Sequence, residues 1–158
     1  TGAGARQLAH AFADDVIYAL TQTRGIAQTR VAFKVRASGG TGEIYIADYD
    51  GHNATAVTRD GAIIASPSWG PNSQWLAYTS YKLNNPDIFS HNLATGERHI
   101  VARYGGSNLS PAVAPGGRLV APVGNDEQAL VLVENRREGF VETRMDAVRF
   151  VPLRGGKQ

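Results

Sequence analysis

A twelve-residue segment occurs twice in this chain. Residues 66–77 (SPSWGPNSQWLA) align with residues 110–121 (SPAVAPGGRLVA), about 44 positions further on. A period of roughly 40–45 residues with short β-type runs is typical of propeller blades, because a single four-stranded sheet cannot bury both of its faces alone. The repeat therefore predicts sheets stacked on one another, an architecture that binds more often than it catalyses.

A third, partial copy precedes these two. Residues 31–33 (VAF) match residues 76–78 (LAY), and residues 43–45 (EIY) match residues 87–89 (DIF). Each unit predicts an inner strand near Ser-Pro, a turn, an apolar strand, a strand that begins with an acidic residue, and an outer strand. We expect the outer strands at residues 57–58 and 100–101. The alternative is a β-sandwich whose turns happen to be evenly spaced.

The N-terminal region predicts one amphipathic helix over residues 6–22. Gly25 is a plausible stop signal a few residues later. Apolar side chains recur at three- and four-residue spacing and form one stripe: Leu8, Phe12, Ala13, Val16, Ile17 and Leu20.

The last quarter of the chain predicts four further strands, which is the number that a third blade needs. Turns are expected at residues 125–126 and 138–139, and the strands at 119–123, 129–134, 141–145 and 148–153.

Composition excludes several classes of function. The net charge is +2 with both signs interspersed, which gives little attraction for nucleic acid or membrane surfaces. Cysteine is absent, so disulfides, thiolate catalysis and Cys-zinc sites are excluded. No apolar run reaches the ~18–20 residues of a membrane span. No signal segment opens the chain, which indicates a cytoplasmic, mature or truncated form.

The sequence contains no catalytic or metal-binding motif. His10 and Asp14 lie four apart on the predicted helix and could pair or share a metal, but ordinary polarity of a helix surface is favoured. The other histidines lack ligand spacing, and no G-x-S-x-G motif is present. For Trp69 and Trp75, packing is favoured over ligand contact. We therefore expect no catalytic residue, metal or cofactor, and a protein that is not an enzyme.

Residues 6–113 resemble the TolB family, the periplasmic propeller proteins of the bacterial Tol-Pal envelope system. The resemblance is carried by several segments in combination. They are residues 8–16 (LAHAFADDV), 24–33 (RGIAQTRVAF), 43–51 (EIYIADYDG), 66–69 (SPSW), 76–80 (LAYTS) and 85–88 (NPDI).

This resemblance implies a fold and a partner. In the family, the helix closes a small N-terminal α/β domain and a six-bladed propeller follows, of which only the helix and about two blades are here. The implied partner is the peptidoglycan-associated lipoprotein, which contacts the propeller mouth, and the implied compartment is the periplasm. The candidate partner-binding residues are Ser66, Pro67, Trp69, Tyr81, Asn84, Asn85 and Asp87.

The tail is similar to a different family. Residues 114–124 (APGGRLVAPVG), 128–133 (QALVLV) and 148–153 (VRFVPL) resemble the C-terminal end of protein-L-isoaspartate O-methyltransferase. That resemblance suggests a chimera with its junction near residues 110–115. No Gly-rich cofactor loop follows a strand here, so binding of S-adenosylmethionine is not expected.

Together these features predict a mainly β fold, with two to three four-stranded propeller-type blades preceded by one amphipathic helix. The expected divisions are residues 1–25 (helix and linker), 26–113 (partial propeller) and 114–158 (β-rich tail, serving as a third blade). The expected function is that of a non-catalytic binding or scaffold fragment that self-associates, for example as two three-blade halves. The alternatives are a fragment of the methyltransferase, or a recombined chimera without a native function.

Overall fold

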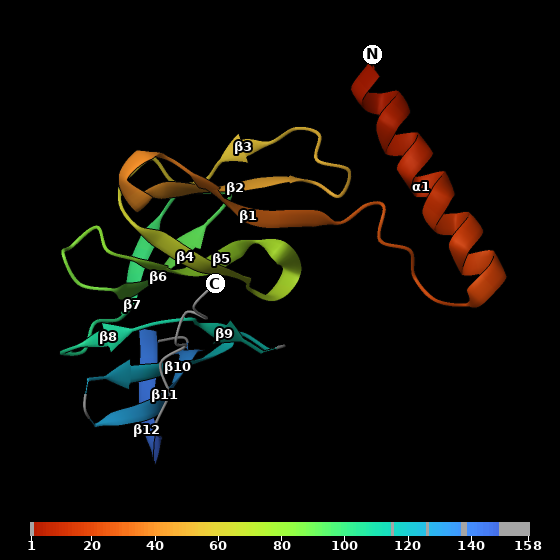
Figure 1. Cartoon of the computed structure of the whole chain (residues 1–158). Coiled ribbons are helices and arrows are strands. Elements are labelled where there is room, and N and C mark those ends of the chain that lie inside the picture. The colour runs from red at the N-terminus through yellow and green to blue at the C-terminus, as the bar shows by residue number, and fades with distance from the viewer. Residues whose placement is uncertain (1, 115, 126, 137–138, 149–158) are drawn as a thin grey trace, which may run out of the picture.

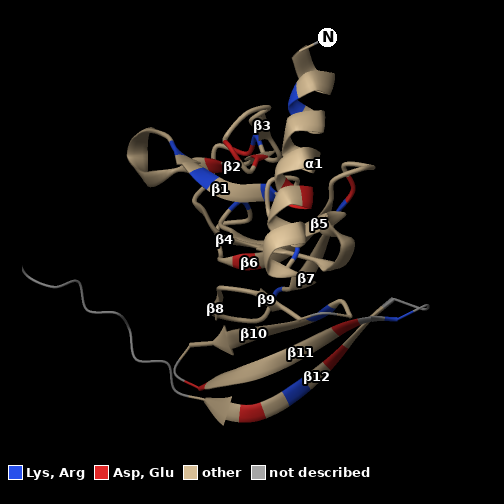
Figure 2. Cartoon of the chain, turned by 90° about the vertical axis from the view of Figure 1, so that its right-hand side faces the viewer, with Lys and Arg blue, Asp and Glu red and all other residues tan. Residues whose placement is uncertain are grey.

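The chain is mainly β, with one N-terminal helix followed by three antiparallel sheets (Figure 1). The computed structural model describes residues 2–114, 116–125, 127–136 and 139–148. In Figure 2 the sheets lie one above another in chain order. This confirms the predicted fold class, because each blade-like unit of the sequence corresponds to one sheet of the stack.

The helix α1 (Gly2–Thr21) includes nearly all of the predicted helical segment and begins four residues earlier. It buries no side chain. Its apolar stripe points to solvent, with Leu8 72%, Phe12 68% and Leu20 77% exposed. Polar contacts hold it to the first sheet instead, since the Arg6 guanidinium donates to both carboxylate oxygens of Asp50.

The first sheet has the order β1-β2-β3. Its strands are β1 (Arg30–Arg36), β2 (Gly42–Asp48) and β3 (Thr55–Ala56), with a short 3-10 turn (Ser38–Gly40) between the first two. The outer strand was predicted at residues 57–58. The observed strand β3 ends at Ala56, so the predicted position is wrong. The regular ladder ends at Ala56, although the Val57 N–H still donates to the Ile44 carbonyl at 2.7 Å and the Ile44 N–H donates to the Thr58 hydroxyl at 2.9 Å.

The second sheet is a complete four-stranded unit with the order β4-β5-β6-β7. Its strands are β4 (Ile64–Trp69), β5 (Trp75–Ser80), β6 (Asp87–Asn92) and β7 (Arg98–Ala102), and a 3-10 turn (Pro71–Ser73) joins the first two. The outer strand predicted at residues 100–101 is confirmed as part of β7.

The third sheet has the order β12-β11-β10-β8, with β9 also paired to β10. Its strands are β8 (Ser107–Asn108), β9 (Ala112–Val113), β10 (Arg118–Gly124), β11 (Gln128–Arg136) and β12 (Gly139–Val148). Three of the four strands predicted for the tail correspond to β10, β11 and β12. Of the fourth, Val148 ends β12 and residues 149–153 lie outside the described residues. The inner strand comes from residues 107–113 instead, so this sheet crosses the expected boundary at 113/114.

The second sheet is buried on both faces by its neighbours. Leu76 and Tyr78 of β5 pack in one cluster with Ile44 of the first sheet. Ala77, which points to the opposite face because side chains alternate along a strand, packs in the other cluster with Leu119 of the third sheet. Trp69 and Trp75 pack at the edges of these two clusters, respectively. The stacking predicted from the repeat therefore forms the core.

Candidate protein-binding surface

The inner strand β4 is interrupted where the repeated Ser-Pro pair falls. Its pairing with β5 shifts register between Ala65 and Ser68. Ser66 has a φ of 54°, a left-handed conformation that only a few per cent of non-glycine residues adopt. Pro67 has no N–H to donate to a ladder. Ser66 and Pro67 therefore remain within β4 but have no partner in β5, and Ser66 is exposed.

The second copy of the Ser-Pro pair has the same geometry. Ser110 has a φ of 49° and lies between β8 and β9, which both pair with β10. Its N–H donates to the hydroxyl of Thr79 at 3.1 Å. The Ser66 and Ser110 hydroxyl oxygens lie 3.4 Å apart, so the repeat brings two exposed hydroxyls together from successive inner strands. Ser110 was not among the predicted site residues, although the duplicated Ser-Pro pair could have identified it.

The turn between β5 and β6 lies at the end of the second sheet where β4 begins. The Tyr81 N–H donates to the Ile63 carbonyl at 2.9 Å, and the Asn84 N–H donates to the Tyr81 carbonyl at 2.9 Å. Asn84 and Asn85 are exposed, and Tyr81 is half-buried. Tyr81, Asn84 and Asn85 are thus carried by one exposed turn at this end of the sheet.

Trp69 and Asp87 lie elsewhere. Trp69 is at the opposite end of β4, paired with Leu76, and the guanidinium of Arg30 lies 5.2 Å from the centre of its ring. Asp87 begins β6 and its side chain is fully buried. Of the predicted site residues, Ser66 and Pro67 thus lie within β4, and the turn residues lie beyond its first residue.

A buried carboxylate anchors the turn that follows β5. Asp60 accepts from Lys82 Nζ at 2.9 Å and from the Arg98 guanidinium at 2.6 Å, and its side chain is 7% exposed. Burial raises the pKa of Asp60, but the hydrogen bonds and charges of Lys82 and Arg98 outweigh it and leave the pKa lowered. Because Lys82 lies beside Tyr81, this ion-paired group fixes the turn against the second sheet.

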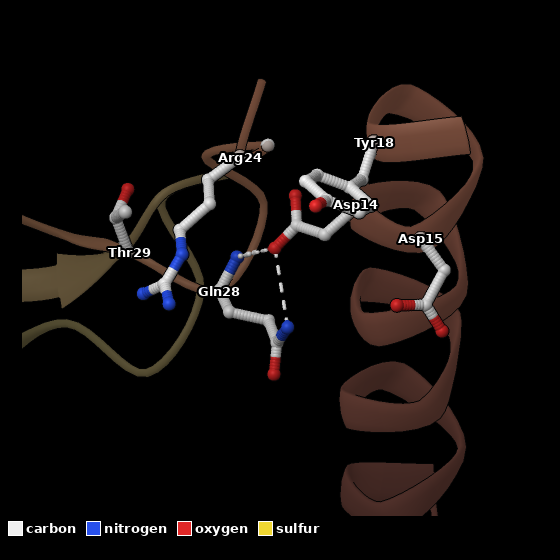
Figure 3. A pocket seen from close by; sticks show the side chains of 7 residues that line it. Asp14, Asp15, Tyr18, Arg24, Gln28 and Thr29 are labelled. Atoms are coloured by element: carbon white, nitrogen blue, oxygen red, sulfur yellow. Dashed lines mark hydrogen bonds between the residues drawn. The ribbon is translucent and has the colours of Figure 1, made fainter. Parts of the chain in front are cut away.

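The helix meets the first sheet at a separate polar junction (Figure 3). The Asp14 carboxylate accepts the N–H groups of Ala27 and Gln28 at 2.8 and 3.1 Å. The first of these bonds is the main cause of a lowered pKa for Asp14. Asp15 points away from these groups in Figure 3, and His10 contacts Asp50 at 3.2 Å. His10 and Asp14 therefore bind different groups and do not converge on one site.

A cavity of about 520 Å³ lies beside this junction, lined by Asp14, Asp15, Tyr18, Arg24, Gln28 and Thr29. Gly25 lies at its edge, where a Cβ would come within 2.1 Å of Asp14 Oδ1. Glycine is thus required there by the close approach of the linker to the helix.

Within the described part of the chain, no three His, Cys, Asp or Glu side chains gather closely enough to hold a metal ion. Among the same residues, no helix has the length and apolar character needed to cross a membrane. The serine pair offers hydroxyl donors and acceptors next to backbone that has left the ladder, which is chemistry suited to hydrogen bonding with another chain.

Comparison with known proteins gives consistent results. The family model described as "TolB beta propeller domain" matches residues 17–144, which extends well past the junction expected near residues 110–115. The chain is 44% identical over 108 residues to "Tol-Pal system protein TolB" of Aromatoleum aromaticum, covering 68% of this chain and 25% of that protein. It is 41% identical over 100 residues to the protein of the same name from Actinobacillus succinogenes, covering 63% of this chain and 23% of that protein. The chain thus spans about a quarter of the length of these curated relatives.

Solved structures agree with the fold. The crystal structure of TolB from Acinetobacter baumannii superimposes with a TM-score of 0.79 at 26% identity, over 89% of this chain and 36% of that one. A structure described as putative TolB from Agrobacterium tumefaciens superimposes with a TM-score of 0.62 at 13% identity, over 75% of this chain and 46% of that one, which supports the fold alone.

Proposed function

We propose, from the premise that this chain belongs to the TolB β-propeller family, that it is a non-catalytic protein-binding segment of a propeller. The observation that carries the proposal is the pair of Ser-Pro interruptions on successive inner strands, each of which has an exposed serine. The backbone groups of a regular strand are used within its ladder, whereas these interruptions place two exposed serine hydroxyls where another chain can contact them.

We define the serine surface as Ser66, Pro67 and Ser110, together with the turn of residues 81–85. Its hydroxyls come from two blades, and its turn is held in place by the Asp60–Lys82 ion pair. A partner that docks here would contact polar groups on a rigid scaffold, which limits the conformational entropy lost on binding.

The partner proposed for this surface is a protein of the Tol-Pal system. The curated relatives carry that system in their names, and the sequence resemblance specifies the peptidoglycan-associated lipoprotein. The corresponding compartment is the periplasm. Because the chain spans about a quarter of those relatives, it presents a fraction of their loops, and we expect weaker binding than theirs.

Calorimetric titration with purified peptidoglycan-associated lipoprotein tests this proposal. Ser66→Lys and Ser110→Lys place a long charged side chain on the serine surface and should abolish the binding heat. Ser73→Lys is the matched control, because Ser73 is also exposed with a φ of 51° but lies in the turn beyond the far end of β4. Equal loss of heat in all three variants, or no heat with the unmodified chain, would contradict the proposal.

A second candidate function is self-association through the ends of the stack. It is favoured by apolar side chains left exposed on the first sheet, where Val31 is 39% and Val35 41% exposed. Two copies of three sheets would together supply the six blades that the family resemblance implies. Multi-angle light scattering should then give a mass of twice the chain or more, and a folded monomer at high concentration would contradict this candidate.

For the organisation of the chain we propose the divisions 1–25, 26–113 and 114–158, with the third sheet shared between the last two. The methyltransferase resemblance of the tail remains a hypothesis about origin. Its consequence for activity is testable, since heat released on titration with S-adenosylmethionine would favour the methyltransferase alternative.

A further inference from the structure

An arginine occupies the same position in two successive connections between the sheets. Arg59 follows β3 in the connection to the second sheet, and Arg103 follows β7 in the connection to the third. The two are separated by the same 44 residues as Ser66 and Ser110 of the repeated Ser-Pro pairs. The repeat therefore gives each of these two connections one arginine at an equivalent point.

Contacts place both arginines at the end of the sheets that carries the β5–β6 turn. Thr58, directly before Arg59, donates its hydroxyl to Glu43 near the start of β2. The Nε atom of Arg103 lies 3.6 Å from the carboxylate of Asp87, which is the first residue of β6 and follows the turn. Because β2 and β6 are equivalent strands of successive sheets, the two arginines lie at the same end of the stack.

Lys82 adds a third cation, which the β5–β6 turn itself carries. Its Nζ donates at 2.9 Å to Asp60, the residue after Arg59, and Arg98 donates to the same carboxylate. One carboxylate thus serves two cations, and the group keeps a net positive charge. The Lys82 side chain is 46% exposed and that of Asp60 only 7%, so the positive member faces solvent. We define the cationic rim as Arg59, Lys82 and Arg103.

The exposed acidic side chains of the first two sheets lie at the opposite end. Asp50 is in the turn after β2, and Glu97 is in the turn before β7. At the rim, in contrast, Asp60 and Asp87 are the carboxylates that pair with the three cations, and both side chains are buried. Glu127, exposed in the β10–β11 turn, makes no ion pair with the rim in the described structure. Charge is therefore segregated, although the net charge of the whole chain is only +2.

The two guanidinium groups have donors to spare. Arg103 approaches Asp87 through Nε, and its side chain is 59% exposed. Arg59 is exposed as well. Within the described part of the chain, no acceptor binds the terminal nitrogens of Arg103 or the guanidinium of Arg59. A planar guanidinium binds a carboxylate through two parallel N–H···O bonds, so each arginine can receive one carboxylate from a ligand.

We propose that the cationic rim binds an acidic segment of the protein partner, in which two carboxylates lie three or four residues apart. This deepens the proposed function and rests on it for the class of partner, since Lys82 belongs to the turn of the serine surface. Stacked sheets lie about 10 Å apart and an extended chain advances about 3.3 Å per residue, so this spacing lets one segment reach both arginines. The exposed amides of Asn84 and Asn85 can hydrogen-bond its backbone.

Two labelled Gly-Ser peptides of equal composition test the proposal with the full chain. One carries two aspartates three residues apart, and the other carries them side by side. In fluorescence anisotropy at low salt, the spaced peptide should bind about two- to fivefold more tightly, because it engages one more arginine. Both affinities should fall as NaCl is added, since exposed charges are screened.

Arg59→Gln is the decisive variant, because Arg59 makes no ion pair within the described chain and its loss should leave the fold intact. It should weaken the spaced peptide by about two- to fivefold and remove its advantage over the adjacent isomer. Arg103→Gln should do the same. Arg24→Gln is the matched control, since it removes the same charge from an exposed arginine in the linker after α1 and should leave both affinities unchanged.

Equal affinity for the two peptides, or an equal loss in Arg59→Gln and Arg24→Gln, would overturn the proposal, because either result indicates attraction by overall charge. A dT oligonucleotide that binds as tightly as the spaced peptide and is weakened by Arg59→Gln would also overturn it, by assigning the rim to nucleic acid.

The proposed function can fail separately. If the lipoprotein gives no heat but the spaced peptide binds as expected, the lipoprotein is not the partner and the rim keeps its ligand class. If the lipoprotein binds the unmodified and Arg59→Gln chains equally, the rim is not used and the serine surface remains the docking site.

Discussion

Glu43 and Asp87 occupy equivalent positions in successive sheets, but only Glu43 has hydrogen-bond partners. The Glu43 carboxylate accepts from the Thr58 hydroxyl at 2.5 Å and from the Gly61 N–H at 2.6 Å. Both carboxylate oxygens of Asp87 are buried without a hydrogen bond, and its nearest cation is Arg103 at 3.6 Å. The shorter side chain and the change from Thr58 to Ala102 at the equivalent position leave this second carboxylate unsatisfied.

Asp87→Asn should therefore stabilise the chain at neutral pH, by about 1 kcal/mol. Burial is the main cause of a raised pKa for Asp87, with Arg103 opposing it. A raised pKa in the folded state means that the charged form costs stability above that pKa. The advantage of the variant should shrink as the pH falls through the folded pKa of Asp87, and urea unfolding at several pH values measures it. An advantage that grows on acidification would contradict this assignment.

Asp60→Asn should destabilise the chain by about 2 kcal/mol at neutral pH, because it leaves Lys82 and Arg98 without their shared carboxylate. The pKa of Asp60 is lowered in the folded state, so its contribution is present above the unfolded pKa and is lost as the pH falls through the folded pKa. The control is Glu97→Gln, since the Glu97 side chain is 62% exposed and should change stability by less than about 0.5 kcal/mol. Similar effects of the two substitutions would show that Asp60 does not stabilise the fold.

Leu76→Ala should cost about 2–5 kcal/mol of unfolding free energy, because Leu76 is fully buried between the first and second sheets. Leu8→Ala on α1 should cost little, because Leu8 is 72% exposed. Thermal unfolding of the two variants compares them directly. A large loss for Leu8→Ala would indicate that the apolar stripe of α1 is covered in solution.

Gly25→Ala should disturb the junction between α1 and the first sheet, since the added Cβ would meet Asp14 Oδ1 at 2.1 Å. The linker must then move, and the hydrogen bonds from Ala27 and Gln28 to Asp14 should be lost. Faster amide exchange at Ala27 and Gln28 reports this. Gly4→Ala is the control, because a Cβ there meets nothing within 4 Å. Unchanged exchange in Gly25→Ala would mean that the linker at Gly25 does not approach Asp14 closely in solution.

The sequence predicted the features that depend on periodicity. The three- and four-residue spacing of apolar side chains located α1, and the repeat gave the strand order of the second sheet. An inner strand near the second Ser-Pro pair was predicted from the repeat, but it was not assigned to the third sheet, where β8 and β9 form it as two pieces of two residues each. Segments this short carry no recognisable alternation.

The places that the candidate site residues take in the fold follow less directly from the sequence, for a different reason. Trp69 and Ser66 lie three residues apart, yet β4 carries them toward opposite ends of one sheet. Asp87 follows an exposed turn, but its side chain points into the interior. Which end of a strand meets solvent, and which way a terminal side chain turns, depend on how neighbouring sheets stack, and one sequence does not encode that in a local pattern.

The stacking also sets the order in which the molecule should come apart. The middle layer has a neighbour on each side, whereas each outer layer is secured on one side, so fraying should start at the two ends and reach the centre last. Deuterium should therefore enter the amides of β5 and β6 most slowly, because the second sheet is the last of the three to open.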